Sequence, residues 1–462
     1  MSALSELIES MSAVERREAI RFLRSPFFNR RTDVIRLFEA LCVLPHADRE
    51  KHWSYVFEKE SFEDQKFRLL QSYLHKLLER FLVVSHQLED SVQHQLALTA
   101  IYRARNMHGA FEKTRKLLEK QMTGSALRNE AYHEALYLLD WQKHQLQYRL
   151  DPTDVSVLRD LSVRADVAFL SRKLRLACLL TAHGKVYQSG GTDPDLSWIV
   201  SLAEREDYRR EPAVEIYRLC YIMLTRPNDE SCFTNFKREL LACADRFSTD
   251  ELHALNILAL NFCVRRINEG QERYNREALD LYKSGLEKGF IFDNGVLSRF
   301  AYYNITAAGL QAGELEWVRF FIHEYKNRLE KKYRESLFSF NLARLEYACK
   351  NFGYVLELLQ YANYRDILLN LSAKTLLIKT YYELDEFDAL TSSLDAMRNY
   401  IRRKRVIGYH RTNYLNIVRY MEKLISLNQS DRTALELFRN SLNSEMILSE
   451  KTFFLSQTGF QE

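Results

Sequence analysis

The chain is poor in the two residues that interrupt helices. Its 462 residues include only 14 glycines and 6 prolines, or about 4% together against an average of roughly 12%. Strands and tight turns depend on these two residues, whereas long helices exclude them. The shortage predicts an all-α protein with about three quarters of its residues in helices.

Long hydrophobic runs are also missing. No stretch of 18 apolar residues occurs, so we expect no helix that crosses a membrane. The first residues, MSALSELIES, do not combine a basic start with an apolar core, which is the pattern of a secretory signal. The expected location is the cytoplasm.

The cysteines do not form a pattern. They number seven, and no CxxC pair occurs. Four of them lie between Cys220 and Cys263, but neighbours there are more than ten residues apart, whereas zinc ligands occur in pairs two to four apart. We therefore expect free thiols in a reducing compartment and no metal site.

Sequence motifs of common enzymes are absent. The chain has no GxxxxGK[ST], no GxGxxG, no HExxH and no GxSxG, which would indicate phosphate, dinucleotide, zinc or acyl-transfer chemistry. His133 and Glu134 lie near Trp141 and His144, but no histidine pair has the i, i+4 spacing of a metal site. We interpret them as structural or solvated residues, and we expect neither an enzyme nor a cofactor.

What the chain does contain is helical periodicity. Leu70, Leu74, Leu77 and Phe81 follow the spacing of one helix face, and comparable series recur along the sequence. Helix starts are marked as well. Ser12 with Glu15, and Ser248 with Glu251, have the spacing of a capping box, in which each side chain bonds the other residue's backbone N–H.

A repeat is present in the C-terminal half. Leu315, Phe352 and Phe387 are 37 and 35 residues apart, and each has apolar residues three and seven positions later. Those residues are Val318 and Ile322, Val355 and Leu359, and Leu390 and Leu394. Turns are predicted just before the anchors, at Gly313-Glu314, Lys350-Asn351 and Asp385-Glu386. The spacing predicts helix–turn–helix units with Phe352 and Phe387 buried between the paired helices.

These residues resemble tetratricopeptide-like α-solenoids over about residues 300–400. The resemblance implies stacked antiparallel helix pairs, closed at one end by an N-terminal helical cap. Of the small residues that the family has in its first helix, Ala343 fits and Ile378 does not, and the closing proline is absent from all three copies.

A second resemblance is narrower. The segment Phe22–Asn29 (FLRSPFFN), together with Tyr414-Leu415-Asn416 and the preceding Arg402-Arg403-Lys404, is similar to an uncharacterised group of bacterial helical-repeat proteins. It implies an architecture and no activity, so no functional residue is transferred.

The sequence is expected to fold as one continuous helical array in four segments. Residues 1–90 form an N-terminal helical module, 91–290 an irregular array of helical hairpins, 291–430 the tetratricopeptide-like repeats and 431–462 a C-terminal capping helix. The N-terminal arginines between Arg16 and Arg31 are interpreted as part of a cap, with a DNA-reading helix-turn-helix as the alternative.

One basic cluster stands out. Residues 398–423 contain eight lysines or arginines and one acid, Glu422, for a net charge of +7. The candidate contacts for a polyanion or a partner are Arg398, Arg402, Arg403, Lys404, Arg405 and Arg411. The functional interpretation is a site for phosphate, an acidic peptide or nucleic acid. The preferred one is a solvated helix end, whose cations complement the helix dipole.

Aromatic residues suggest a second kind of surface. Tyr400, Tyr409, His410 and Tyr414 alternate with the basic residues, and further rings lie near loops, at Phe27, Phe28, Phe290, Phe292, Phe300, Tyr302 and Tyr303. Most are expected to fill gaps between helices, and some to line a concave peptide groove.

The leading hypothesis for the function is a non-enzymatic scaffold that binds a protein or peptide. The alternative is nucleic-acid or polyanion binding through residues 398–423.

Overall fold

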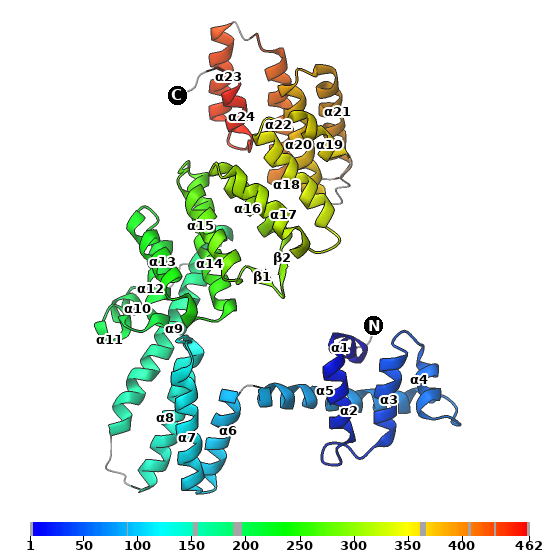
Figure 1. The fold of residues 1–462 in the computed structure, drawn as a ribbon, viewed down its shortest axis with the longest axis vertical. Coiled ribbons are helices and arrows are strands. Elements are labelled where there is room, and N and C mark those ends of the chain that lie inside the picture. Colours follow the sequence, from blue (N-terminus) through cyan, green and yellow to red (C-terminus); the bar gives the residue numbers. More distant parts are fainter. Residues whose placement is uncertain are drawn as a thin grey trace. The chain divides into compact units, whose positions relative to one another are not determined.

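A computed structural model describes residues 3–89, 91–150, 156–187, 196–360, 366–404, 408–428 and 431–459. Helices hold 80% of this described chain, and they number 24. The prediction of an all-α protein is therefore confirmed (Figure 1). In the same residues, no helix is both long enough and apolar enough to cross a membrane.

The chain divides into two units, Met1–Lys173 with Leu202–Val214, and Leu174–Ser201 with Glu215–Glu462. Unit 1 contains α1 (Ala3–Ser10), α2 (Ala13–Arg24), α3 (Thr32–Val43), α4 (Arg49–Val56), α5 (Asp64–Glu89), α6 (Ser91–Ala104), α7 (His108–Gly124), α8 (Glu130–Leu150) and α11 (Glu206–Arg209). Three helices contribute residues to both units: α9 (Ser156–Tyr187), α10 (Ser197–Ala203) and α12 (Pro212–Thr225).

Unit 2 contains the remaining elements. Its helices are α13 (Glu230–Ala242), α14 (Thr249–Asn268), α15 (Tyr274–Glu287), α16 (Arg299–Gln311), α17 (Leu315–Tyr325), α18 (Arg334–Ala348), α19 (Phe352–Gln360), α20 (Ile367–Glu383), α21 (Phe387–Arg403), α22 (Gly408–Ser426), α23 (Arg432–Ser444) and α24 (Lys451–Ser456), with 3-10 turns η1 (Ala244–Arg246) and η2 (Lys326–Arg328). Strands β1 (Phe292–Asp293) and β2 (Val296–Leu297) form an antiparallel hairpin in which Phe292 pairs with Leu297.

The capping boxes are confirmed at both predicted sites. Ser12 and Glu15 bond each other's backbone N–H before α2, and Ser248 and Glu251 do the same before α14. The N-terminal core gathers apolar residues from α1–α5, including Leu23, Phe38, Trp53 and Phe67. The segment FLRSPFFN forms the end of α2 and the turn after it, where the Asn29 amide donates to the carbonyls of Leu23 and Arg31.

One type of turn joins five helix pairs. Asn106, Gly270, Gly313, Lys350 and Asp385 all have positive φ, between 56° and 86°. The next residue in each turn donates its backbone N–H to the carbonyl five positions earlier, as Glu314 does to Gly309. This is the Schellman ending of a helix, and it occurs at all three turns that the repeat predicted.

The repeat anchors are less buried than predicted. The residues three and seven positions after each anchor are buried as expected, but Phe352 is half-buried and Phe387 is 43% exposed. Each anchor is the first residue of its helix, so its side chain points back over the preceding turn. There it contacts a tyrosine of the helix before: Tyr347 for Phe352, and Tyr382 for Phe387. The expected burial of these two rings between paired helices was therefore wrong.

Consecutive helices of unit 2 contact one another from α13 to α22, and α16 and α20 also contact α18. Apolar residues of α18–α20 form one core cluster, and those of α20–α24 form another. Gly408 is the first residue of α22 and has a φ of 63°. One boundary differs from the sequence analysis. The segment 431–462, expected to form one capping helix, holds both α23 and α24.

Candidate functional site

The predicted basic residues lie at the end of α21 and the start of α22. Arg398 pairs with Asp395 on its own helix and with Glu422 on α22. Arg402, Arg403, Lys404 and Arg411 are exposed and have no ion pair within the described residues, and Arg405 lies outside those residues. The cluster is thus partly neutralised, at Arg398 and at Arg419, which pairs with Glu445, while Arg402, Arg403, Lys404 and Arg411 face solvent.

Unit 2 also contains two pockets that none of the described cations of this cluster lines. The first pocket has a volume of about 600 Å³ and the second about 390 Å³. Four residues line both pockets: Tyr303, Ser372, His410 and Tyr414. We call the joined pockets the α16–α22 groove, because α16, α18, α20 and α22 supply most of their walls. Volumes of this size are typical of ligand sites.

The groove follows the sequence repeat. On α16 it is lined by Tyr303, Ala307, Leu310 and Gln311, and on α18 by Phe340, Arg344, Tyr347 and Ala348. Both sets have the spacing i, i+4, i+7, i+8, which is one face of a helix, and they lie 37 residues apart. Thr375 and Lys379 of α20 repeat the positions of Phe340 and Arg344, 35 residues later.

The regular spacing between the groove-lining residues and the repeat anchors is a signal for the groove that was not recognised from the sequence. Ala307, Arg344 and Lys379 each lie eight residues before an anchor of the repeat, which are Leu315, Phe352 and Phe387. Two successive repeats therefore carry a cation at the same position of a groove-lining helix. The aromatic residues singled out in the sequence locate the groove better than the basic ones do. Five of them line it: Phe300, Tyr303, Tyr409, His410 and Tyr414.

Arg344 lies among aromatic residues of the groove. Its guanidinium is 4.4 Å from the ring centre of Tyr303 and 5.9 Å from that of Phe340. Its Nη1 donates to the Tyr303 carbonyl at 3.2 Å and to the Asn341 side chain at 3.1 Å. Burial disfavours the charged form and lowers the pKa of Arg344 below its usual value.

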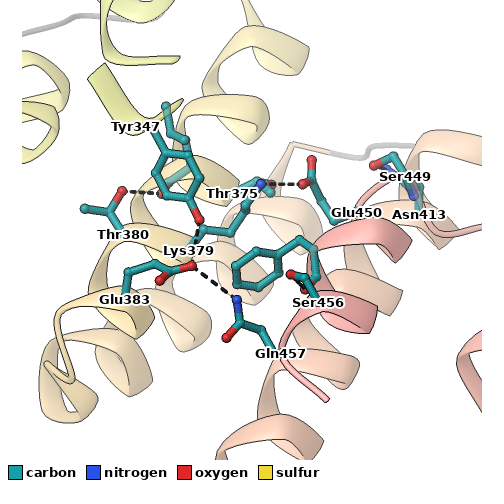
Figure 2. A network of polar contacts seen from close by, with 12 residues as sticks. Tyr347, Thr375, Lys379, Thr380, Glu383, Asn413, Ser449, Glu450, Ser456 and Gln457 are labelled. Carbon is teal, nitrogen blue, oxygen red and sulfur yellow. Dashed lines mark hydrogen bonds and ion pairs between the residues drawn. The ribbon is translucent and has the colours of Figure 1, made fainter. Parts of the chain in front are cut away.

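Lys379, the next cation in the register, is neutralised. Its Nζ lies 2.7 Å from Glu450 (Figure 2), and it is 4.9 Å from the ring centre of Tyr347 and 4.8 Å from that of Phe453. The Tyr347 hydroxyl and the Gln457 amide both donate to Glu383 at 3.2 Å. Burial next to that carboxylate raises the pKa of Tyr347. This network joins α18 and α20 to the C-terminal segment and forms one wall of the groove.

The smaller pocket is apolar with one ion pair at its edge. Arg299 lies 3.3 Å from Asp366 and contacts the rings of Phe300 and Tyr333 at 4.6 and 4.7 Å. The Asp366 carboxylate also accepts hydrogen bonds from the backbone N–H groups of Leu368 and Leu369. It therefore has partners both on Arg299 and at the start of α20. Leu337, Leu368 and Leu369 complete an apolar surface suited to aliphatic or aromatic side chains.

Unit 1 contains a buried histidine that the sequence analysis singled out. His133 of α8 is 4% exposed, and its Nε2 lies 3.5 Å from Glu211 without a hydrogen bond. Burial, with smaller effects from Arg164 and Arg128, lowers its pKa to about 4. The folded protein therefore keeps His133 neutral well below the pH at which an exposed histidine binds a proton.

His133 is expected to make stability depend on pH. Between pH about 6.5 and about 4 the unfolded chain binds a proton that the folded chain does not, so the free energy of unfolding falls as the pH falls. The loss attributable to His133 should be about 1 kcal/mol at pH about 5.5 and approach about 3 kcal/mol near pH 4. Urea denaturation at several pH values measures it, and His133→Gln should flatten the curve between pH 7 and 5.5. An unchanged slope in that variant would contradict the assignment.

Comparison with known proteins gives no match: no family model fits the chain, and neither a curated protein nor a solved structure is similar to it.

Proposed function

We propose that this protein is a non-enzymatic scaffold whose unit 2 is a tetratricopeptide-like solenoid of stacked antiparallel helix pairs. In this proposal the first helices of successive pairs line a concave surface, and an extended peptide segment of a partner protein lies in it. The observation that carries the proposal is the α16–α22 groove, which runs across four successive first helices instead of closing around one small molecule.

The chemistry of the lining supports a peptide as the ligand. Rings such as Tyr303, Tyr409 and Phe300 give a large contact area and lose little conformational entropy on binding. Most charged groups on the walls are already paired within the protein. Binding would then rest on shape, apolar contact and a few polar contacts, which is the mode of repeat scaffolds.

The polyanion alternative rests on a different surface. Arg402, Arg403, Lys404 and Arg411 are exposed near a helix–helix corner, and such a corner attracts polyanions weakly through point charges that salt screens. It lies outside the groove, so substitutions can separate the two functions.

A selection from a phage library of random linear peptides tests the proposal. Peptides enriched on the wild-type protein should lose binding when Ala348, an exposed residue of the groove, is changed to Trp to fill the pocket. They should still bind Thr391→Trp, which adds the same ring to an exposed position of α21. They should also bind Arg402→Gln/Arg403→Gln/Arg405→Gln.

Two results would contradict the groove as a peptide site. One is a selection that enriches no peptide, and the other is equal binding to the wild type and to Ala348→Trp. Loss of binding in the triple arginine variant alone would favour the basic cluster. Circular dichroism melting of each variant checks that it is folded.

A further inference from the structure

Arg344 makes no ion pair with the described residues, although Glu450 lies close enough to affect its charge. Five charged side chains other than histidine line the groove: Arg299, Arg344, Lys379, Asp366 and Glu450. Arg299 pairs with Asp366, and Lys379 pairs with Glu450. Arg344 has no ion pair within the described residues. Its two hydrogen bonds both use Nη1, so Nε and Nη2 make no hydrogen bond with the described residues.

The surrounding polar groups are engaged with one another. Asn413 exchanges two hydrogen bonds with Ser449, and the hydroxyls of Ser372 and Tyr414 lie 3.0 Å apart. Thr375 donates to a carbonyl of its own helix. These groups leave Nε and Nη2 of Arg344 unused, so a ligand with two neighbouring acceptor oxygens can bind both donors.

We propose that Arg344 binds the carboxylate of an aspartate or glutamate side chain within a bound peptide, and so selects for acidic segments flanked by apolar residues. This inference rests on the proposed function of the groove. Nε and Nη2 form the edge of the guanidinium that receives a carboxylate through two parallel hydrogen bonds. Hydrogen bonds between two charged groups are stronger than neutral ones, so one correct acid contributes much of the selectivity.

The charge of the site favours a carboxylate over a phosphate. One unpaired cation balances a single negative charge, and Glu450 on the same wall would repel part of a dianion. The position of Arg344 favours an acid inside the peptide over its C-terminus. The lining continues on both sides of α18, to Tyr303 and Ala307 of α16 and to Ser372 and Thr375 of α20. A peptide that occupies the groove therefore extends past Arg344 in both directions.

The first test compares peptide selections on the wild type and on Arg344→Gln. Wild-type peptides should share an aspartate or glutamate between apolar residues. Peptides selected on Arg344→Gln should keep the apolar residues and lose the acid. Equal enrichment of the acid on both proteins, or no acid in the wild-type peptides, would overturn the proposal.

The second test changes the peptide and leaves the protein intact. A selected peptide and its copy with Asn or Gln in place of the acid are titrated by fluorescence anisotropy. The wild type should bind the amide copy about 10- to 100-fold more weakly, whereas Arg344→Gln should bind both copies equally. Arg344→Lys should fall between, because it keeps the charge without the paired donors. Equal binding of both copies by the wild type contradicts the inference.

Further arms identify other anions and separate the two proposals. A copy with phosphoserine at the acid's position that binds at least tenfold better than the acid would assign the site to phosphate instead. A truncated peptide that ends at the acid and binds as well as the full one would assign it to a C-terminus. If Ala348→Trp abolishes binding while the acid has no effect, the groove function stands and the role of Arg344 fails. If Ala348→Trp has no effect, the groove function itself fails.

Discussion

Replacing Phe321 with alanine is expected to lower the free energy of unfolding by about 3–5 kcal/mol, the usual cost of removing a fully buried ring. Phe321 lies in α17 and has no exposed surface. Its ring centre is 5.2 Å from that of Tyr302, 5.5 Å from Trp317 and 5.3 Å from Tyr325. The cavity would disturb all three rings, and also the hydrogen bond from the Tyr302 hydroxyl to the Ile322 carbonyl.

The neighbouring residue is a matched control. Phe320 is in the same helix and is 58% exposed, so Phe320→Ala removes the same atoms with little change in buried area. Its cost should stay below about 1 kcal/mol. Urea denaturation followed by circular dichroism at 222 nm measures both variants. Similar losses of stability for Phe321→Ala and Phe320→Ala would mean that α17 does not pack against α16 through the face that carries Phe321.

The second large effect is expected at Gly309 of α16, which packs directly against Val318 and Trp317 of α17. A Cβ added there would overlap Val318 Cγ2 and lie 3.6 Å from the Trp317 ring. Val318 is fully buried, so it cannot move without disturbing the core. Gly309→Ala should therefore destabilise the protein by about 1–3 kcal/mol, although alanine is the better helix former by about 1 kcal/mol.

Two variants test this explanation. Gly353 lies in α19 with open space around its Cα, so Gly353→Ala should be neutral or slightly stabilising. Val318→Ala removes the methyl group that the new Cβ meets, and the double variant Gly309→Ala/Val318→Ala should lose less stability than the sum of the two single changes. Strict additivity would show that the contact between these two positions is not the cause.

Some features of the protein followed from local patterns. The scarcity of glycine and proline predicted the helical content, because these residues act on the backbone wherever they occur. Both capping boxes and the three turns of the repeat were predicted correctly, since each depends on residues only three to six positions apart. The burial of Val318, Val355 and Leu390 followed from helical periodicity for the same reason.

The predictions from the sequence were wrong where the direction of a side chain mattered more than its spacing along the chain. Phe352 and Phe387 are regularly spaced anchors, but the first side chain of a helix points back over its turn, and the period alone does not give that direction. The basic cluster of residues 398–423 attracted attention by its net charge. Its charge count could not reveal that Arg398 pairs with Asp395, a residue outside the segment.

The sequence by itself determined the high helical content, the two capping boxes and the apolar faces of the repeat helices, because those properties arise within one helix. Only the tertiary structure decided which charges remain unpaired. Lys379 meets Glu450, 71 residues away, whereas Arg344, at the same position of the preceding repeat, meets no acid within the described residues. Ion pairing depends on distances of a few ångströms between helices far apart in the sequence, and no local pattern contains that information.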